Sequence, residues 1–202
     1  MNIYFDMEFT GLHQNTTPIS IGLISECGKY SFYAEFTDFN QSQCDDWINK
    51  NVIDNLEYND KDGYCHISNN CIRMKGSFKI ISDELNAWLR HINGGGQIQF
   101  ISDVCHYDMV LLINLLTFKK SAFHLPNWIS PVCHDINQNI ATYYNVLDAD
   151  AFNITRERIA QIDKVDEDLL RQMSQKNKHN SLYDAVVIKS IHQKLCKGAS
   201  DL

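Results

Sequence analysis

Three apolar runs with strand character open the chain. Residues 2–5, 18–24 and 30–36 contain β-favouring residues or alternate between apolar and small or polar ones, and Cys27-Gly28-Lys29 forms a turn between the last two. Consecutive strands joined by short connections pair antiparallel. These runs therefore predict a sheet that begins with antiparallel hairpin strands.

Helix periodicity and further short strands follow the opening runs. The triple glycine at 94–96 is read as a turn from helix to strand, because no Lys-Ser or Lys-Thr pair of a phosphate-binding loop follows it. The expected elements, in order, are a short helix around Trp47, a helix at 77–92, a strand at 98–102, a helix at 107–118, a strand at 128–134, and mostly helix from 137, ending with 181–196. Strands that alternate with helices predict an α/β fold with a mixed sheet. No repeat, linker or low-complexity stretch divides the chain, so we expect one domain over residues 1–202.

Composition and charge narrow the class of protein. With 202 residues and 44% hydrophobic residues, the chain can bury a substantial core. The formal charge of −7 argues against a protein that coats duplex DNA. The longest apolar run, 109–113, ends at Asn114 and is too short to span a membrane. Asp6 and Glu8 stand where a signal peptide would have its apolar core, so we expect a cytoplasmic protein.

Seven cysteines raise the question of a zinc site. Three of them precede a histidine, at Cys65-His66, Cys105-His106 and Cys133-His134, but no C-x-x-C pair occurs. Free, buried thiols are the commoner explanation of such a pattern. We expect free thiols and keep a zinc-dependent interaction protein as an alternative.

Carboxylates at particular places in these elements are the strongest functional signal. Asp6 and Glu8 lie two residues apart on the first strand and so share a face. Asp108 begins the apolar helix, and Asp184 lies among apolar residues of the last helix, five residues after His179. Each feature alone has an ordinary explanation, such as helix capping for Asp108. Together they form a set that can hold cations.

This set resembles the three motifs of the DEDDh branch of the DnaQ-like 3′–5′ exonucleases, and is most similar to bacterial RNase AS-type exoribonucleases. The likeness is carried by residues 3–9, by 18–28 leading into 33–36, and by Tyr107-Asp108 before an aliphatic run. It implies a ribonuclease H-like α/β fold, in which a mixed sheet with antiparallel hairpin strands first and parallel strands later is flanked by helices. It also implies a homodimer, for which Trp47 or Trp128 could supply interface contacts.

The resemblance also implies roles for individual residues. Asp6 would bridge two Mg²⁺ or Mn²⁺ ions, Glu8 and Asp184 would hold the ion that activates water, and Asp108 the ion near the leaving group. His179 would be the general base. Asp103 is a competitor of Asp108 for its place, and Asp108 is preferred because it directly precedes the apolar helix. The implied substrate-binding residues are Met7, Phe9, Thr10 and Leu12, and Lys176 and Lys178 are candidate phosphate contacts.

Two positions depart from the family pattern. Ser181 stands where the family commonly has Ala, and Tyr183 precedes the last acid. Neither change removes a ligand. Both alter the surroundings of the expected site.

The expected function is that of a metal-dependent 3′–5′ exoribonuclease that releases nucleoside 5′-monophosphates from single-stranded RNA. The alternatives are a DNA exonuclease of proofreading or phage type and a non-catalytic nucleic-acid-binding module. The excess of acidic residues fits an enzyme that grips a single-stranded 3′ end through cations over a short footprint.

Overall fold

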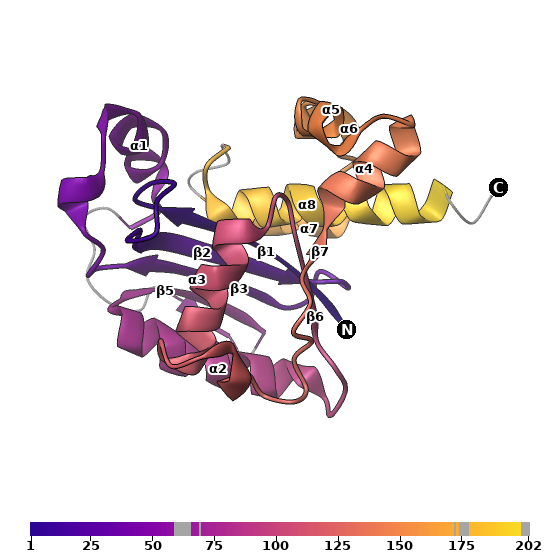
Figure 1. The fold of residues 1–202 in the computed structure, drawn as a ribbon. Helices are drawn as coiled ribbons and strands as arrows, with labels where there is room; N and C mark the ends of the chain where they lie inside the picture. The colour runs from indigo at the N-terminus through magenta and orange to yellow at the C-terminus, as the bar shows by residue number, and fades with distance from the viewer. Residues whose placement is uncertain (59–65, 69, 172, 174–177, 199–202) are drawn as a thin grey trace.

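A single mixed sheet of seven strands runs through the protein in the order β4-β5-β3-β2-β1-β6-β7 (Figure 1). The computed structural model describes residues 1–58, 66–68, 70–171, 173 and 178–198. β2 pairs antiparallel with both β1 and β3, whereas β6 lies parallel to β1 and β5 parallel to β3. The strands are β1 Asn2–Phe9, β2 Pro18–Ser25, β3 Ser31–Phe36, β4 His66–Ile67, β5 Cys71–Gly76, β6 Gln99–Ser102 and β7 His134–Asp135.

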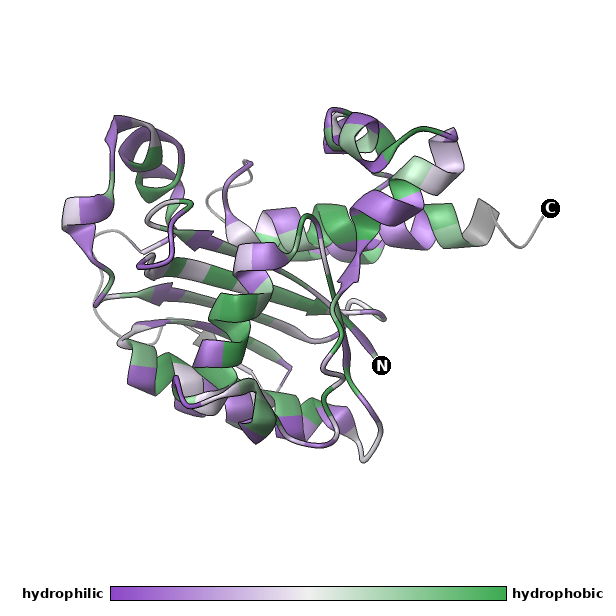
Figure 2. Cartoon of the chain, in the orientation of Figure 1, coloured by the Kyte–Doolittle hydropathy of each residue, from purple (hydrophilic) through white to green (hydrophobic). Residues whose placement is uncertain are grey.

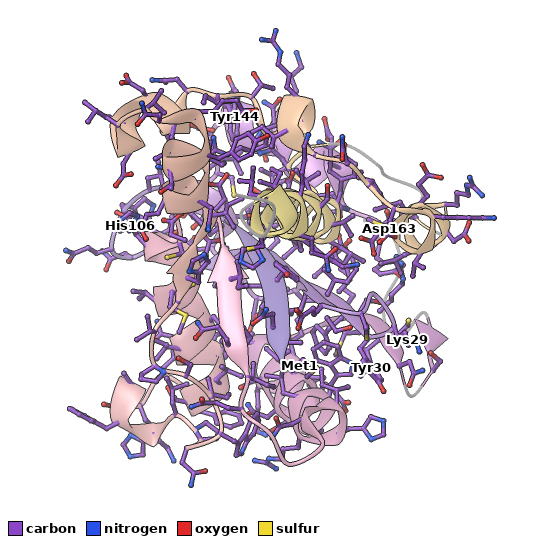
Figure 3. The ribbon with its side chains drawn as sticks, turned by 90° about the vertical axis from the view of Figure 1, so that its right-hand side faces the viewer. Met1, Lys29, Tyr30, His106, Tyr144 and Asp163 are labelled. Atoms are coloured by element: carbon purple, nitrogen blue, oxygen red, sulfur yellow. The ribbon has the colours of Figure 1, made fainter. Side chains whose placement is uncertain are left out.

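Helices cover both faces of this sheet, as the view along α8 shows (Figure 3). Apolar side chains of α2 and α3 pack on one face, and those of α4 to α8 on the other. The α-helices are α1 Asp46–Asn51, α2 Phe78–Asn93, α3 His106–Thr117, α4 Ile136–Tyr144, α5 Asp148–Phe152, α6 Arg156–Ile159, α7 Lys164–Leu170 and α8 Ser181–Gly198. Three short 3₁₀ turns complete the assigned helical elements: η1 Gln41–Gln43, η2 Ile53–Asn55 and η3 Ala122–His124.

Strand alternation divides the core into two layers. Phe5 and Met7 of β1 belong to the cluster beneath α2 and α3, while Tyr4 belongs to the cluster beneath α8. Hydrophobic residues accordingly run along the central strands and along α3 (Figure 2). Residues of β1 with even numbers therefore face α8.

One predicted strand is wrong, and an observed strand was not predicted. Residues 128–134 were expected to form a strand, but Ile129 makes only an isolated bridge to Ile98, and the regular strand is the two-residue β7. Pro131 lies in this stretch and cannot donate a ladder hydrogen bond. Strand β5 was not predicted, because Arg73 and Lys75 alternate with its two apolar core residues and give the run a polar composition.

The predicted turn at the triple glycine is confirmed. Gly94 ends α2 in the left-handed region with φ of 59°, and Gly95 follows with φ of 86°. Both angles favour glycine because a Cβ atom is disfavoured there. Within the described part of the chain, no helix is long and apolar enough to cross a membrane.

Candidate active site

The two carboxylates of β1 lie on the face that α8 covers. Phe5 and Met7, which flank Asp6, point into the opposite core layer, so Asp6 and Glu8 project toward α8. Asp6 pairs with Gly22 across the antiparallel ladder, and Glu8 pairs with Ser20 near the end of the strand. The shared face that the sequence predicts for Asp6 and Glu8 is therefore present.

Gly22 lets the first turn of α8 approach the sheet. A Cβ atom at this position would lie far inside van der Waals distance of the backbone of Ser181 and Leu182. Beside it, the buried hydroxyls of Ser20 and Ser181 lie 3.0 Å apart and form a hydrogen bond. Ser181, where the resembling family commonly has Ala, thus ties α8 to β2. The close approach carries Asp184, one turn further along α8, to the end of β1.

His179 lies between the carboxylates of β1 and α8. Its backbone N–H donates to Asp184 Oδ2 at 2.7 Å, and its Nδ1 atom lies 3.7 Å from Glu8 Oε1. The ring edge also meets the Trp47 indole, with centroids 4.9 Å apart. The backbone φ of His179 is 68°, an angle that residues other than glycine seldom adopt. These contacts hold the residue in that conformation.

One group of three potential metal ligands stands out among the described residues. Ligand atoms of Glu8, His179 and Asp184 all lie within 4.8 Å of one another. Such proximity of two carboxylates and an imidazole allows them to share a cation. No other group of three His, Cys, Asp or Glu side chains within the described ranges meets this criterion.

Asp108 approaches the same place from the first turn of α3. Its Oδ1 atom accepts the Met7 N–H at 2.9 Å, so the carboxylate is tied to the backbone between Asp6 and Glu8. Its competitor Asp103 is engaged elsewhere, because Arg156 binds it through two hydrogen bonds of 2.6 and 2.8 Å. Both acids line the cavity, but Asp108 is the one attached to β1.

Burial and mutual repulsion make these carboxylates hard to ionise. Burial, followed by the charges of Asp108, Asp184 and Glu8, raises the pKa of Asp6 well above its usual range. Burial raises the pKa of Asp108 to about 7, and burial together with the charge of Glu8 raises the pKa of Asp184 to about 7. The contact with Glu8 raises the pKa of the His179 imidazole. Added positive charge would therefore stabilise the ionised form of these carboxylates.

A cavity of about 680 Å³ joins these groups to solvent. Its floor is formed by carboxylates, and its walls are largely apolar. The apolar wall residues come from the end of β1 and the loop after it, from α1 and its C-cap, from the α5–α6 segment and from α8, and are Phe9, Leu12, Trp47, Ile48, Val52, Phe152, Ile154, Val187 and Ile188. A volume of this size accommodates a nucleotide-sized ligand.

The four substrate-binding predictions have different outcomes. Phe9 lines the cavity and stacks on Tyr107 with centroids 5.7 Å apart, and Leu12 lines it with 77% of its surface exposed. Met7 also borders the cavity, but its side chain is packed in the core beneath α2 and α3. The side chain of Thr10 is not among those that line the cavity. That side chain is buried, and its hydroxyl bonds Gln43 and the Thr17 backbone, which stabilises the loop after β1.

Other predictions concern residues that lie next to, or outside, the part of the chain that the structure describes. Lys178 is exposed and lines the cavity, whereas Lys176 lies outside the described residues. Cys65, one member of the three Cys-His pairs, is also outside them. Trp128 is half-buried against the core, and homodimer formation stays a prediction.

Sequence reasoning did not place two aromatic residues and one arginine at this cavity. Trp47, considered for a dimer interface, lines the cavity and contacts His179. Phe152 and Arg156 come from a helical region with no motif in its sequence. A glycine inside an apolar strand was a readable signal for the close approach at Gly22, but nothing in the sequence marks Phe152.

Comparison with known proteins yields little. No protein-family model matches the chain, and no curated protein matches it by sequence. Among solved structures, the chain is similar to one from the structure of the yeast NOT1 MIF4G domain co-crystallised with CAF1. The identity is 16%, the TM-score is 0.49, and the match covers 98% of this chain and 80% of that chain. A likeness of this size carries no argument about function.

The ribonuclease H-like fold class predicted from the sequence is corrected here. The solved structure that matches carries the description of a MIF4G domain co-crystallised with CAF1, and no family model or curated protein supplies the ribonuclease H-like class. The structure also adds β5 and β4 outside the three opening strands. The fold is a seven-stranded mixed sheet with helices packed on both faces.

The donor set fits hard divalent cations. Asp6, Glu8, Asp108 and Asp184 offer carboxylate oxygens, which Mg²⁺ and Mn²⁺ prefer. Burial, followed by the charges of neighbouring acids, raises the pKa of Asp6, Asp108 and Asp184, so a bound cation would favour their ionised forms. Among the described residues that line the cavity, the basic side chains are Arg156, which is bound to Asp103, the exposed Lys178, and His179 beside Glu8.

Without divalent cations, we expect the free energy of unfolding to fall as the pH rises from about 4 to about 7. Asp108 and Asp184 have pKa values of about 7 in the folded chain, whereas an unperturbed Asp titrates near pH 4. Between these values the folded chain holds protons that the unfolded chain has released, so rising pH favours unfolding. We expect a loss of about 2 kcal/mol or more. Urea denaturation in EDTA at pH 5 and pH 8 measures it.

Added Mg²⁺ or Mn²⁺ should remove most of this loss at pH 8, because a cation binds the ionised carboxylates and stabilises the folded chain. The same titration in Ca²⁺-free buffer with 5 to 10 mM Mg²⁺, roughly the excess that a millimolar site requires, is the paired measurement. Greater stability at pH 8 than at pH 5 in EDTA would contradict the assignment.

Proposed function

We propose that the protein is a metal-dependent 3′–5′ exonuclease that acts on single-stranded nucleic acid, RNA in preference to DNA. The observation that carries this proposal is the convergence of Asp6, Glu8, Asp108 and Asp184 with His179 at one cavity. The order of these residues along the chain is the order of the DEDDh exonuclease motifs, which the sequence resembles. The preference for RNA rests on that resemblance.

The chain's own residues divide the work of phosphodiester hydrolysis. Two divalent ions, when bound, would supply activation of a water molecule and stabilisation of charge on the phosphate and on the leaving 3′ oxygen. The carboxylates of Asp6, Glu8 and Asp184 would hold these ions together with Asp108. His179 would take the proton of the attacking water, whose oxygen bonds to phosphorus while the bond to the 3′ oxygen breaks. The products are a nucleoside 5′-monophosphate and a strand shortened by one nucleotide.

The position of His179 suits a base that depends on bound cations. Its imidazole is held near Glu8, whose negative charge raises its pKa and favours the protonated form. Neutralising Glu8 and Asp184 with a cation removes the cause of that rise, so the imidazole becomes free to accept a proton near neutral pH.

A panel digestion tests the proposal. Single-stranded RNA and DNA of one sequence, labelled at the 5′ end, are incubated with Mg²⁺, with Mn²⁺ or with EDTA. We expect a ladder that shortens from the 3′ end one nucleotide at a time, faster for RNA, and no cleavage in EDTA. Faster digestion of DNA would show that DNA is the preferred substrate, whereas the proposed hydrolysis mechanism would still hold. Absence of cleavage with both metals would leave only a binding protein.

A further inference from the structure

Helix α5 presents an exposed aromatic side chain to the same cavity. Phe152 is 61% exposed, although it is a large apolar residue, and it lines the cavity that holds the carboxylates. Figure 1 shows α1 and α5 projecting on the same side of the sheet, with the start of α8 between them. Phe152 thus comes from a different element than Phe9, at the end of β1, and Leu12, in the loop after it.

The backbone around Phe152 is fixed by Arg156. The guanidinium donates from Nη1 to the carbonyls of Ala151 and Ile154, at 2.7 and 2.8 Å, on either side of Phe152. Its remaining donors bind Asp103 twice and Asn137 Oδ1 once. All five N–H donors of Arg156 are therefore engaged within the protein, and Arg156 is a positioning residue rather than a phosphate ligand.

The start of α5 is held by the same network. Asn137, which accepts from Arg156, donates through Nδ2 to the Asp148 carbonyl at 2.8 Å. Both ends of α5 are thus tied to Asp103 at the end of β6 and to the start of α4. An exposed aromatic ring on an anchored helix is organised in advance for a ligand, since little conformational entropy is lost on binding.

The charge of the cavity indicates what this ring binds. The cavity is lined by several acids, and its described basic side chains are Lys178, the fully engaged Arg156 and His179, which lies among the carboxylates. A polyanionic strand therefore gains little from phosphate contacts on the walls, and must gain affinity from its bases. An aromatic face stacks on any base, because every base has a π face.

We infer that Phe152 stacks on an unpaired nucleobase of the substrate and so selects single strands. The inference rests on the proposed function and adds a second base contact, from α5, to the one expected near Phe9. A paired base is already stacked in a duplex and cannot lie on the ring, so duplex ends are disfavoured until they fray.

Binding measurements test the inference without relying on turnover. The affinity of a 5′-fluorescein single-stranded RNA is measured by anisotropy in Ca²⁺ for the wild type and for Phe152→Ala, Phe152→Trp and Phe123→Ala. We expect about tenfold weaker binding for Phe152→Ala and unchanged binding for Phe152→Trp. Phe123 is 99% exposed and is not among the residues lining the cavity, so Phe123→Ala is the matched control.

Strands with one abasic position locate the contact. Each of the four nucleotides at the 3′ end is made abasic in turn and tested with the wild type and Phe152→Ala. At one position, removal of the base should weaken binding to the wild type about as much as Phe152→Ala weakens binding of the intact strand. At that position the abasic strand and the intact strand should bind Phe152→Ala with equal affinity. Equal losses for both proteins at all positions would overturn the inference, as would unchanged binding of Phe152→Ala.

The outcomes separate the two proposals. If the wild type binds no strand, both proposals fail. Binding that depends on Phe152 without cleavage in Mg²⁺ or Mn²⁺ would keep the stacking contact and overturn the exonuclease. Cleavage with an unaffected Phe152→Ala variant would keep the exonuclease and overturn the stacking contact.

Discussion

Replacing Asp184 by Asn is expected to lower exonuclease turnover about a thousandfold or more while the folded chain becomes more stable. The loss follows because an amide oxygen replaces a carboxylate in the group formed by Glu8, His179 and Asp184, and this weakens cation binding and removes charge where the metal acts. The backbone N–H of His179 retains an acceptor, since an Asn oxygen can replace Oδ2 at 2.7 Å. The position of the base is therefore kept.

The gain in stability comes from relief of repulsion. In the metal-free chain, burial and the charge of Glu8 oppose ionisation of Asp184. A neutral amide of the same shape removes that cost, so thermal unfolding at pH 8 in EDTA should occur a few degrees higher, about 2–4 °C per kcal/mol. A stability gain with loss of activity is typical of a functional site.

Two controls make the result specific. Glu157→Gln removes an exposed acid of the same cavity, outside the central group, and should change turnover less than about threefold. Calorimetric titration with Mn²⁺ should show weaker binding for Asp184→Asn and unchanged binding for Glu157→Gln. Wild-type turnover of Asp184→Asn in a preparation free of other nucleases would refute the proposed metal ligands.

Much of the secondary structure could be read from the sequence, because local periodicity determined it. The helix expected at 77–92 is α2 at Phe78–Asn93, and the helix expected at 107–118 is α3 at His106–Thr117. Both have core residues at helix spacing and end at a residue with left-handed φ. Local pattern failed for β5, whose pairing with β3 depends on residues far away in the chain.

The candidate site divides in the same way. Asp6 and Glu8 were predictable as a pair because strand alternation is local. Their proximity to Asp108 and Asp184 followed only from a resemblance, since the distances depend on how α3 and α8 dock. The pairing of Asp103 with Arg156, 53 residues away, leaves no trace in the sequence.

Docking of α8 depends on the absence of a side chain at Gly22. This residue lies in the middle of β2, paired with Asp6, and the backbone of Ser181 and Leu182 rests directly on it. Both partners are embedded in the core, where Leu182 is fully buried. Backbone on both sides leaves nothing flexible that could move away from an added methyl group.

We therefore expect Gly22→Ala to destabilise the protein by about 3 kcal/mol or more and to abolish exonuclease turnover in whatever fraction folds. To admit the methyl group, α8 must shift from the sheet, which separates Asp184 from Glu8 and breaks the hydrogen bond between Ser20 and Ser181. Denaturant unfolding and Mn²⁺ titration measure the two effects. Gly76→Ala is the matched control, because a Cβ atom there meets side chains rather than backbone, those of Ile80 at 3.4 Å and Met74 at 3.6 Å. It should cost less than about 1 kcal/mol and leave metal binding intact. A Gly22→Ala protein with wild-type stability and wild-type affinity for Mn²⁺ would show that the site does not depend on this contact.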